Sequence, residues 1–312
     1  MSYIDSQDVE KKRAFLERIS TMYYINEKSQ QEIAEQFGIG RSSVARFLGE
    51  AKQAGIVQIR INSTKTEQFR NSELEYQLMS RYKLRDCAVL RNDVAGATDE
   101  VVPEYIDRII PQKGILGIGG GRTMYQLAKR AWMISKRPEL SVIQLTGSMG
   151  SIPETSVTKL WAESLDAKGI YISAPLLADD SQNKKFIEAN SMVREALERL
   201  REVDTSIISI GATDLNTRMR YLAHFQDINV EEVYKKCVGD AVFHFFDQNG
   251  RFCLEELSER VIGISHSDYL KISNKIVIAY GAQKTQAIRG AIQGGMVNIL
   301  VTDCELARGL LE

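Results

Sequence analysis

The sequence has few cysteines, and their spacing suits neither a zinc site nor a disulfide scaffold. Cys87, Cys237, Cys253 and Cys304 lie far apart and include no Cys-x-x-Cys pair. A zinc ribbon and a small disulfide-rich secreted domain are therefore excluded, and no metal site is expected. We expect reduced thiols in a cytoplasmic protein.

An export signal and a membrane span are also lacking. No apolar run approaches the roughly 20 residues that a bilayer span requires, and the opening residues MSYIDSQDVEKKRAF are too charged for a secretory signal. The 40 Lys and Arg nearly cancel the 41 Asp and Glu, which leaves a net charge of -1. Global charge therefore says nothing about nucleic acid, and we expect no membrane partner.

The length and composition of the chain are typical of a two-domain protein. Its 312 residues are 44% hydrophobic and 26% charged, and they contain no repeat or low-complexity tract. This length and balance favour one small and one large globular domain. The polar stretch 62–66 places the boundary, so residues 1–62 and 63–312 are the expected domains.

Residues 29–48, SQQEIAEQFGIGRSSVARFL, predict a helix-turn-helix. Ser29 and Glu32 have the spacing of a capping box, Gly38 suits the end of the first helix, and Ser42 or Ser43 is expected to cap the second. The apolar and small residues match the skeleton of a DNA-binding helix-turn-helix at positions Ile33, Ala34, Phe37, Gly38, Ile39, Val44 and Phe47. An ordinary helical hairpin is the alternative.

Local charge supports DNA contact. Residues 38–65 hold the cations Arg41, Arg46, Lys52, Arg60 and Lys65 against the single anion Glu50, so their sum is 5 minus 1, or +4. The candidate DNA-binding side chains are Arg41, Ser42, Ser43 and Arg46 on the second helix and Arg60 on a wing. Arg46 comes first, opposite Val44 and Phe47, with a base or a phosphate as its target. A strand at 56–61 and a helix at about 9–24 would complete a winged module.

The next segment, from about 67 to 82, has helical spacing. Phe69, Leu74, Leu78 and Tyr82 form an apolar face that must be covered. It either packs on the large domain or pairs with its copy in a dimer.

The remainder alternates short apolar runs with amphipathic stretches. Buried strands are expected at 87–90, 115–118, 142–145, 170–172, 207–210, 276–279 and 299–301, and helices at 123–134, 155–168, 184–200 and 285–293. This order predicts an α/β domain with a largely parallel sheet covered on both faces.

The stretch 117–125, GIGGGRTMY, joins a strand to a helix. A dinucleotide fingerprint would need its last glycine at 122 or 124, where Arg122 and Met124 stand, so no nucleotide cofactor is expected. The turn instead suits one phosphate, bound by the amides of Gly120 and Gly121, the Arg122 cation and the Thr123 hydroxyl. A bare tight turn is the alternative.

Similar loops follow other strands, and we expect them to converge on one crevice. They are 146–151, which contains Gly147 and Ser148, then 211–214 and 281–284. Lys284 opens a helix, where a cation is unfavourable unless an anion lies nearby, so it is either a phosphate partner or a solvated lysine. Asp240 could cap a turn or accept from a hydroxyl.

With these motifs in place, the chain resembles bacterial transcriptional regulators of the SorC family, which are grouped with DeoR-type regulators. The resemblance covers nearly the whole chain and is carried by QQEIAEQFGIGRSSVARFLGEAKQAGIVQIRI, LGIGGGRTMYQLA, VGDAVFHFFDQNG and YGAQKTQAIRGAIQGGMVNILVTDCELARGLL. It departs at Tyr280, Gly281 and Ala282, where the family often has two adjacent glycines before the lysine. The resemblance therefore does not name the sugar.

The resemblance implies an amino-terminal winged helix-turn-helix and a Rossmann-like effector domain related to sugar-phosphate isomerases and deaminases. Such regulators bind operator DNA, respond to a sugar or sugar phosphate, and assemble as homo-tetramers, or dimers of dimers. Position by position, the effector residues fall on Gly120, Gly121, Arg122, Thr123, Gly147, Ser148, Asp240 and Lys284.

The alternative is a sugar-phosphate isomerase or deaminase that carries a DNA-binding module, because fold alone does not decide function. Such an enzyme needs a base. His224, His244 and His266 show no metal spacing or nucleophile pairing, so structural roles are expected for them, although Asp214 or Asp240 could act as a base. The sequence favours a regulator without catalytic residues.

Overall fold

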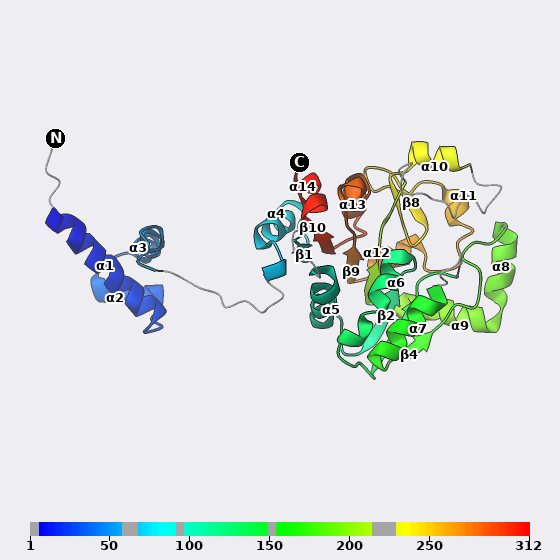
Figure 1. Cartoon of the computed structure of the whole chain (residues 1–312), viewed down its shortest axis with the longest axis horizontal. Helices are drawn as coiled ribbons and strands as arrows, with labels where there is room; N and C mark the ends of the chain where they lie inside the picture. The colour runs from blue at the N-terminus through cyan, green and yellow to red at the C-terminus, as the bar shows by residue number, and fades with distance from the viewer. Residues whose placement is uncertain (1–5, 58–67, 92–96, 149–153, 214–228) are drawn as a thin grey trace. The chain divides into compact units, whose positions relative to one another are not determined.

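The computed structural model describes residues 6–57, 68–91, 97–148, 154–213 and 229–312, and the chain divides into two compact units, Met1–Asn62 and Ser63–Glu312 (Figure 1). The small unit contains the helices α1 (Ser6–Tyr24), α2 (Gln30–Phe37) and α3 (Arg41–Gln53). None of the helices in the described ranges has both the length and the apolar character that crossing a bilayer requires.

The helix-turn-helix forms as its caps predict. The Ser29 hydroxyl accepts from the Glu32 amide at 3.2 Å, and the Glu32 carboxylate accepts from the Ser29 amide at 2.8 Å. Gly38 ends α2 in the left-handed region, at φ 62°. The start of α3 corrects the prediction, because Gly40 is its N-cap and makes no side-chain cap. An N-cap needs an extended backbone, whereas Ser42 and Ser43 already lie in the first helical turn.

The expected apolar skeleton is the core of the small unit. This core consists of the buried Ile19, Met22, Ile33, Ala34, Val44 and Leu48, with Phe15, Tyr23, Tyr24, Phe37, Ile39 and Phe47 packed against them. The expected strand at 56–61 lies outside the described residues from 58 onward, and Ile56 and Val57 form no strand.

The large unit is built on a seven-stranded parallel sheet with the order β1-β10-β9-β5-β2-β3-β4. The strands are β1 (Asp86–Leu90), β2 (Gly114–Ile118), β3 (Leu140–Gln144), β4 (Lys168–Ile170), β5 (Thr205–Ile208), β9 (Asn274–Ile278) and β10 (Ile299–Asp303). Each strand overlaps one of the seven apolar runs, so the predicted α/β class and parallel sheet are confirmed.

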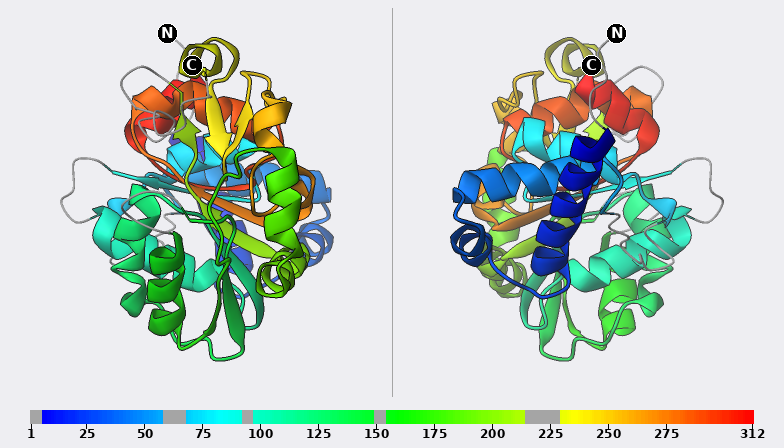
Figure 2. Two further views of the ribbon diagram at one scale, coloured as in Figure 1. Left: turned by 90° about the vertical axis from the view of Figure 1, so that its right-hand side faces the viewer. Right: turned by 90° about the vertical axis from the view of Figure 1, so that its left-hand side faces the viewer.

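Helices cover both faces of this sheet, as two separate apolar clusters show (Figure 2). One face is covered by α5 (Ala97–Ile109), α6 (Arg122–Ala128) and α7 (Glu154–Leu165). The other carries α4 (Ser72–Tyr82), α9 (Ser191–Arg199), α12 (His266–Lys271), α13 (Thr285–Gln293) and α14 (Cys304–Leu311). Strand residues alternate between the faces, so Cys87 and Val89 contribute to one cluster and Ala88 and Leu90 to the other.

Three expected helices are shorter than predicted. The stretch 123–134 ends as α6 at Ala128 and continues only as a 3-10 turn, Ala131–Met133. The stretch 184–200 is divided into α8 (Ser181–Ala189) and α9 at Asn190, whose extended backbone and side chain cap α9. The stretch 67–82 becomes helical only at Ser72, after the N-cap Asn71.

A second, antiparallel sheet was not anticipated. It has the order β6-β7-β8, with β6 (Gly211–Ala212), β7 (Gly239–Ala241) and β8 (His244–Phe246). Val242 and Phe243 form the two-residue turn between β7 and β8 at φ 46° and 69°, a region that side-chain-bearing residues rarely adopt. With α10 (Val230–Lys236) and α11 (Glu255–Ser258) this sheet encloses a small third core.

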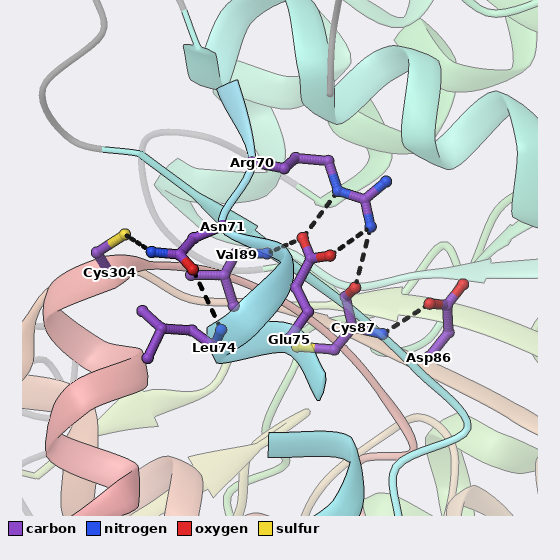
Figure 3. Close-up of polar contacts among 8 residues, drawn as sticks. All are labelled: Arg70, Asn71, Leu74, Glu75, Asp86, Cys87, Val89 and Cys304. Carbon is purple, nitrogen blue, oxygen red and sulfur yellow. Dashed lines mark hydrogen bonds and ion pairs between the residues drawn. The ribbon is translucent and has the colours of Figure 1, made fainter. Parts of the chain in front are cut away.

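The start of the large unit is fastened to the edge strand β1 (Figure 3). Arg70 holds Glu75 through two hydrogen bonds of 2.8 and 3.0 Å and donates to the Cys87 carbonyl at 3.3 Å. Glu75 also accepts from the Val89 amide at 2.9 Å. Leu78 of α4 is fully buried in the large core, which confirms that this helix packs on its own domain.

Candidate functional site

Four glycine-rich loops follow the carboxyl ends of neighbouring strands in the large sheet. The strands β9, β5, β2 and β3 are neighbours in this order and run parallel, so their carboxyl ends lie side by side. The chain leaves β2 toward β3 and β5 toward β9, in opposite directions. In open α/β sheets this reversal marks the crevice where ligands bind.

The loop after β2 opens the candidate site. The Gly119 amide donates to the Ile207 carbonyl at 2.9 Å, which ties the loop to β5. Gly121 lies at φ 92° and caps α6 without a side-chain hydrogen bond, so glycine meets a backbone requirement here. The exposed Arg122 and the half-buried Thr123 follow. They line a cavity of about 440 Å³ together with Val102, Gln126, Leu127, Arg130, Ile278 and Tyr280.

Lys284 lies over the end of β5. Its ammonium donates to the Ile210 carbonyl at 2.8 Å and to the Ser209 hydroxyl at 3.2 Å. Gly281, at φ 89°, turns the chain after β9, and its amide donates to Asp303 at 2.9 Å. Lys284 directly precedes α13 as predicted, but it is half-buried against backbone and not a solvated surface lysine.

Asp240 of β7 lies next to the segment that follows β5. It pairs with Gly211 of β6, and a Cβ atom at Gly211 would lie 2.0 Å from the Asp240 Oδ1 atom. Glycine is therefore required at 211 for the carboxylate to take this position. The other carboxylate oxygen accepts from the Phe243 amide at 3.2 Å, so Asp240 also stabilises the strained turn.

Electrostatics link three of the expected residues. Burial lowers the pKa of Lys284, the nearby Arg122 cation lowers it further, and the Asp240 carboxylate raises it. Arg122 and Asp240 therefore each lie within electrostatic reach of Lys284, although the three residues come from separate stretches of the sequence. Two cations suit a phosphate, and a nearby carboxylate suits a hydroxyl group.

The loop after β3 contributes differently from the other loops. The amides of Gly147 and Ser148 donate to the carbonyls of Ile262 and Ala174, at 2.7 and 3.0 Å. A Cβ atom at Gly147 would lie 2.2 Å from the Pro175 carbonyl oxygen, so this glycine permits close backbone packing. The Ser148 side chain is half-buried. Residues 149–153 lie outside the described part of the chain.

The expected DNA-reading face lies on α3. Arg41, Ser42 and Arg46 are exposed, whereas Ser43 is half-buried. The Arg46 guanidinium lies 5.0 Å from the centroid of the Phe47 ring and 3.7 Å from Glu50. Arg46 is thus not opposite Phe47 as predicted, because a long arginine can reach over the ring of its neighbour on a helix.

Two further residues of this face escaped prediction. Ala45 and Gly49 are exposed between the polar positions, at the i+4 and i+8 spacing from Arg41. An exposed alanine among polar residues was the available signal, since a methyl group can contact thymine. Similarly, Ser209 interrupts an apolar strand end, a signal that its hydroxyl serves another purpose. Arg60 lies outside the described residues.

The family model described as "Putative sugar-binding domain" matches residues 66–312, which include every effector residue expected from the sequence. The chain belongs to this sugar-binding family.

Relatives of this sugar-binding protein are similar along almost their whole length. The "Deoxyribonucleoside regulator" of Bacillus subtilis strain 168 is 28% identical, and the alignment covers 98% of this chain and 99% of that one. "Transcriptional regulator LsrR" of Escherichia coli K12 is 27% identical over 95% and 93% of the two chains. The full-length sorbitol operon regulator SorC of Klebsiella pneumoniae shares the fold with a TM-score of 0.71 at 23% identity, covering 97% and 100%.

The two relatives, both named as regulators and neither as an enzyme, confirm the predicted transcriptional regulator, and the SorC structure confirms its fold. The surroundings of His244 agree with the structural role expected for it. It is buried, its Nδ1 is paired with the Ser258 hydroxyl, and its Nε2 with the Ile264 carbonyl at 2.9 Å. Burial lowers the pKa of His244 to about 4, so it is a neutral structural residue at ordinary pH. His266 stacks on Phe252, whereas His224 and Asp214 lie outside the described residues.

Proposed function

We propose that residues 63–312 bind a phosphorylated sugar at the carboxyl ends of β2 and β5. The observation that carries this proposal is Lys284, which is held at the end of β5 at the switch point of the sheet and lies within electrostatic reach of Arg122 and Asp240. The phosphate contacts the amides of Gly120 and Gly121, the Thr123 hydroxyl and the two cations. Asp240 and the Ser148 side chain accept or donate hydrogen bonds to sugar hydroxyls.

Residues 1–62 read the operator in this proposal. Arg41, Ser42, Ser43 and Arg46 of α3 contact the major groove, and Arg60 contacts the flanking backbone. The effector acts by binding the operator-competent and incompetent assemblies with different affinity, because only differential affinity shifts such an equilibrium. The protein works in the cytoplasm as a homo-tetramer, or dimer of dimers, which multiplies the few contacts of one helix-turn-helix.

A ligand screen tests the proposed effector class. Hexose and pentose phosphates are compared by thermal shift with the matching neutral sugars and with inorganic phosphate. A ligand selective for the native state raises the unfolding midpoint with its occupancy. We expect a saturable shift with at least one sugar phosphate and a smaller one with its neutral sugar. Equal shifts with sugar and sugar phosphate would refute the phosphate site.

A further inference from the structure

Two cysteines that are distant in the sequence meet in the third core. Cys237 ends α10, and Cys253 follows β8, where its amide donates to the Phe245 carbonyl at 2.9 Å. The Cys253 sulfur lies 3.9 Å from the carbonyl oxygen of Lys236, the residue directly before Cys237, and both cysteines belong to the third core. The backbone around both cysteines is fixed, because the Cys237 amide donates to the Val233 carbonyl at 2.9 Å.

The two thiols differ in exposure and in pKa, and oxidation by a peroxide begins at the thiol that is more exposed and ionises more readily. Cys253 is half-buried, and the neighbouring Cys237 thiol lowers the pKa of the Cys253 thiol, whereas the pKa of Cys237 is raised. Cys237 is itself buried but lines a cavity of about 1290 Å³. By contrast, burial raises the pKa of Cys87, which keeps that thiol protonated and unreactive.

We propose that Cys237 and Cys253 form a reversible disulfide when the protein meets a peroxide. The Cys253 thiolate attacks one peroxide oxygen, the O–O bond breaks, and hydroxide leaves and takes up a proton to become water. Cys237 then attacks the sulfenic sulfur, and the S–S bond forms as the S–O bond breaks. The Cys237 proton converts the second hydroxide to water. Two thiols are thereby oxidised and one peroxide is reduced to two waters.

The disulfide would act on the effector site, a consequence that rests on the proposed function. A disulfide brings the sulfurs to about 2.05 Å, shorter than any non-bonded contact between two sulfur atoms. Cys237 is three residues before Asp240, and its carbonyl accepts from the Thr213 hydroxyl next to β6. The contraction therefore pulls on β7, and we expect effector affinity to fall about 5-fold, the lower end of typical coupling between sites.

Peptide mapping tests the bond itself. The full-length protein is treated with hydrogen peroxide, its free thiols are alkylated, and it is digested without reductant. We expect a linked peptide pair that contains Cys237 and Cys253 and separates on reduction with dithiothreitol. Cys253→Ser abolishes the link, and the matched control Cys304→Ser retains it. Oxidation of Cys253 to sulfinic acid without a link, or links through Cys87, would overturn the proposal.

Two further measurements separate a folding defect from loss of the disulfide, and failure of the disulfide from failure of the proposed function. Circular dichroism under reducing conditions shows whether Cys253→Ser folds, and Cys237→Ser provides a second variant that must also lack the link. Effector affinity is measured on reduced and peroxide-treated wild-type protein with the best sugar phosphate of the screen. An unchanged affinity in the linked protein refutes the coupling. Failure of the reduced protein to bind any sugar phosphate refutes the proposed function and leaves the disulfide standing on the peptide map.

Discussion

Among single residues, Lys284 is the one on which the proposed phosphate contact depends most. Its ammonium is held by the Ile210 carbonyl and the Ser209 hydroxyl, which leaves one of its three protons for a ligand. We predict that Lys284→Met, which keeps much of the side-chain volume, weakens sugar-phosphate binding by about 1.5 to 3 kcal/mol, the usual contribution of a hydrogen bond to a charged group. Operator affinity persists.

Isothermal titration with the sugar phosphate and fluorescence anisotropy with operator DNA measure the two effects of Lys284→Met. Lys271→Ala is the matched control, because the Lys271 side chain is 74% exposed and forms an ion pair with Asp268 on its own helix. An unaltered effector dose response in Lys284→Met would remove this lysine from the site.

The lowered pKa of Lys284 predicts a pH dependence. A bound phosphate favours the charged ammonium, so binding draws a proton onto Lys284 once the pH exceeds the pKa of this residue in the free protein. Affinity is therefore greatest below that pKa and falls as the pH rises through it. Because the pKa of Lys284 is lowered, this loss of affinity begins at a lower pH than it would for a lysine with an ordinary pKa. Titrations across this range check the slope, and Lys284→Met should flatten it.

At the scale of the element, α3 carries the operator-binding prediction. Arg46→Ala should weaken operator binding by about 1 to 3 kcal/mol, the contribution of a bidentate base contact, and leave effector binding intact. Its present partner Glu50 lies 3.7 Å away on an exposed face, so the arginine is readily released to DNA.

Anisotropy with operator and with scrambled DNA distinguishes a base contact from a phosphate contact at Arg46. A base contact relaxes specificity at one position, whereas a phosphate contact lowers affinity for both DNAs equally. Arg13→Ala is the control within the small unit, because Arg13 is exposed and contacts Glu17 on α1. Loss of effector response at unchanged DNA affinity would contradict the assignment.

The first turn of α4 supports a stability prediction at the same scale. Glu75 accepts from Arg70 and from the Val89 amide, and both side chains are largely buried, with 10% and 15% of their areas exposed. Glu75→Ala removes the carboxylate partner of Arg70 and the acceptor of the Val89 amide, and it should cost about 3 kcal/mol. Urea unfolding measures the loss. Glu73→Ala, exposed on the same helix, should change stability by less than about 0.5 kcal/mol.

At the scale of the whole molecule, the proposed assembly makes a prediction. A tetramer presents its helix-turn-helix units in pairs, so a single operator half-site should bind far more weakly than two half-sites spaced by whole helical turns of about 10 base pairs. Analytical ultracentrifugation of the free protein should give the mass of four chains. A monomer that binds one half-site and two half-sites equally would refute this assembly.

Local patterns determined much of the fold. Ser29, Glu32 and Gly38 act through neighbours in the sequence, so the boundaries of α2 could be predicted from spacing alone. The seven buried strands were found because a parallel sheet covered on both faces needs continuous apolar runs. The β7–β8 hairpin could not be found this way, since Val242 and Phe243 lack the turn signals that its left-handed backbone normally requires.

The sequence by itself determined a helix-turn-helix, a parallel α/β domain and the residue types of an anion site, because these depend on short-range periodicity and capping. Only the tertiary structure decided which residues meet. It brought Arg122 and Asp240 within electrostatic reach of Lys284, used the Gly147 amide for backbone pairing, and placed Cys253 beside the end of α10 next to Cys237. Strand order sets these contacts, and strand order depends on long-range packing that no local pattern records.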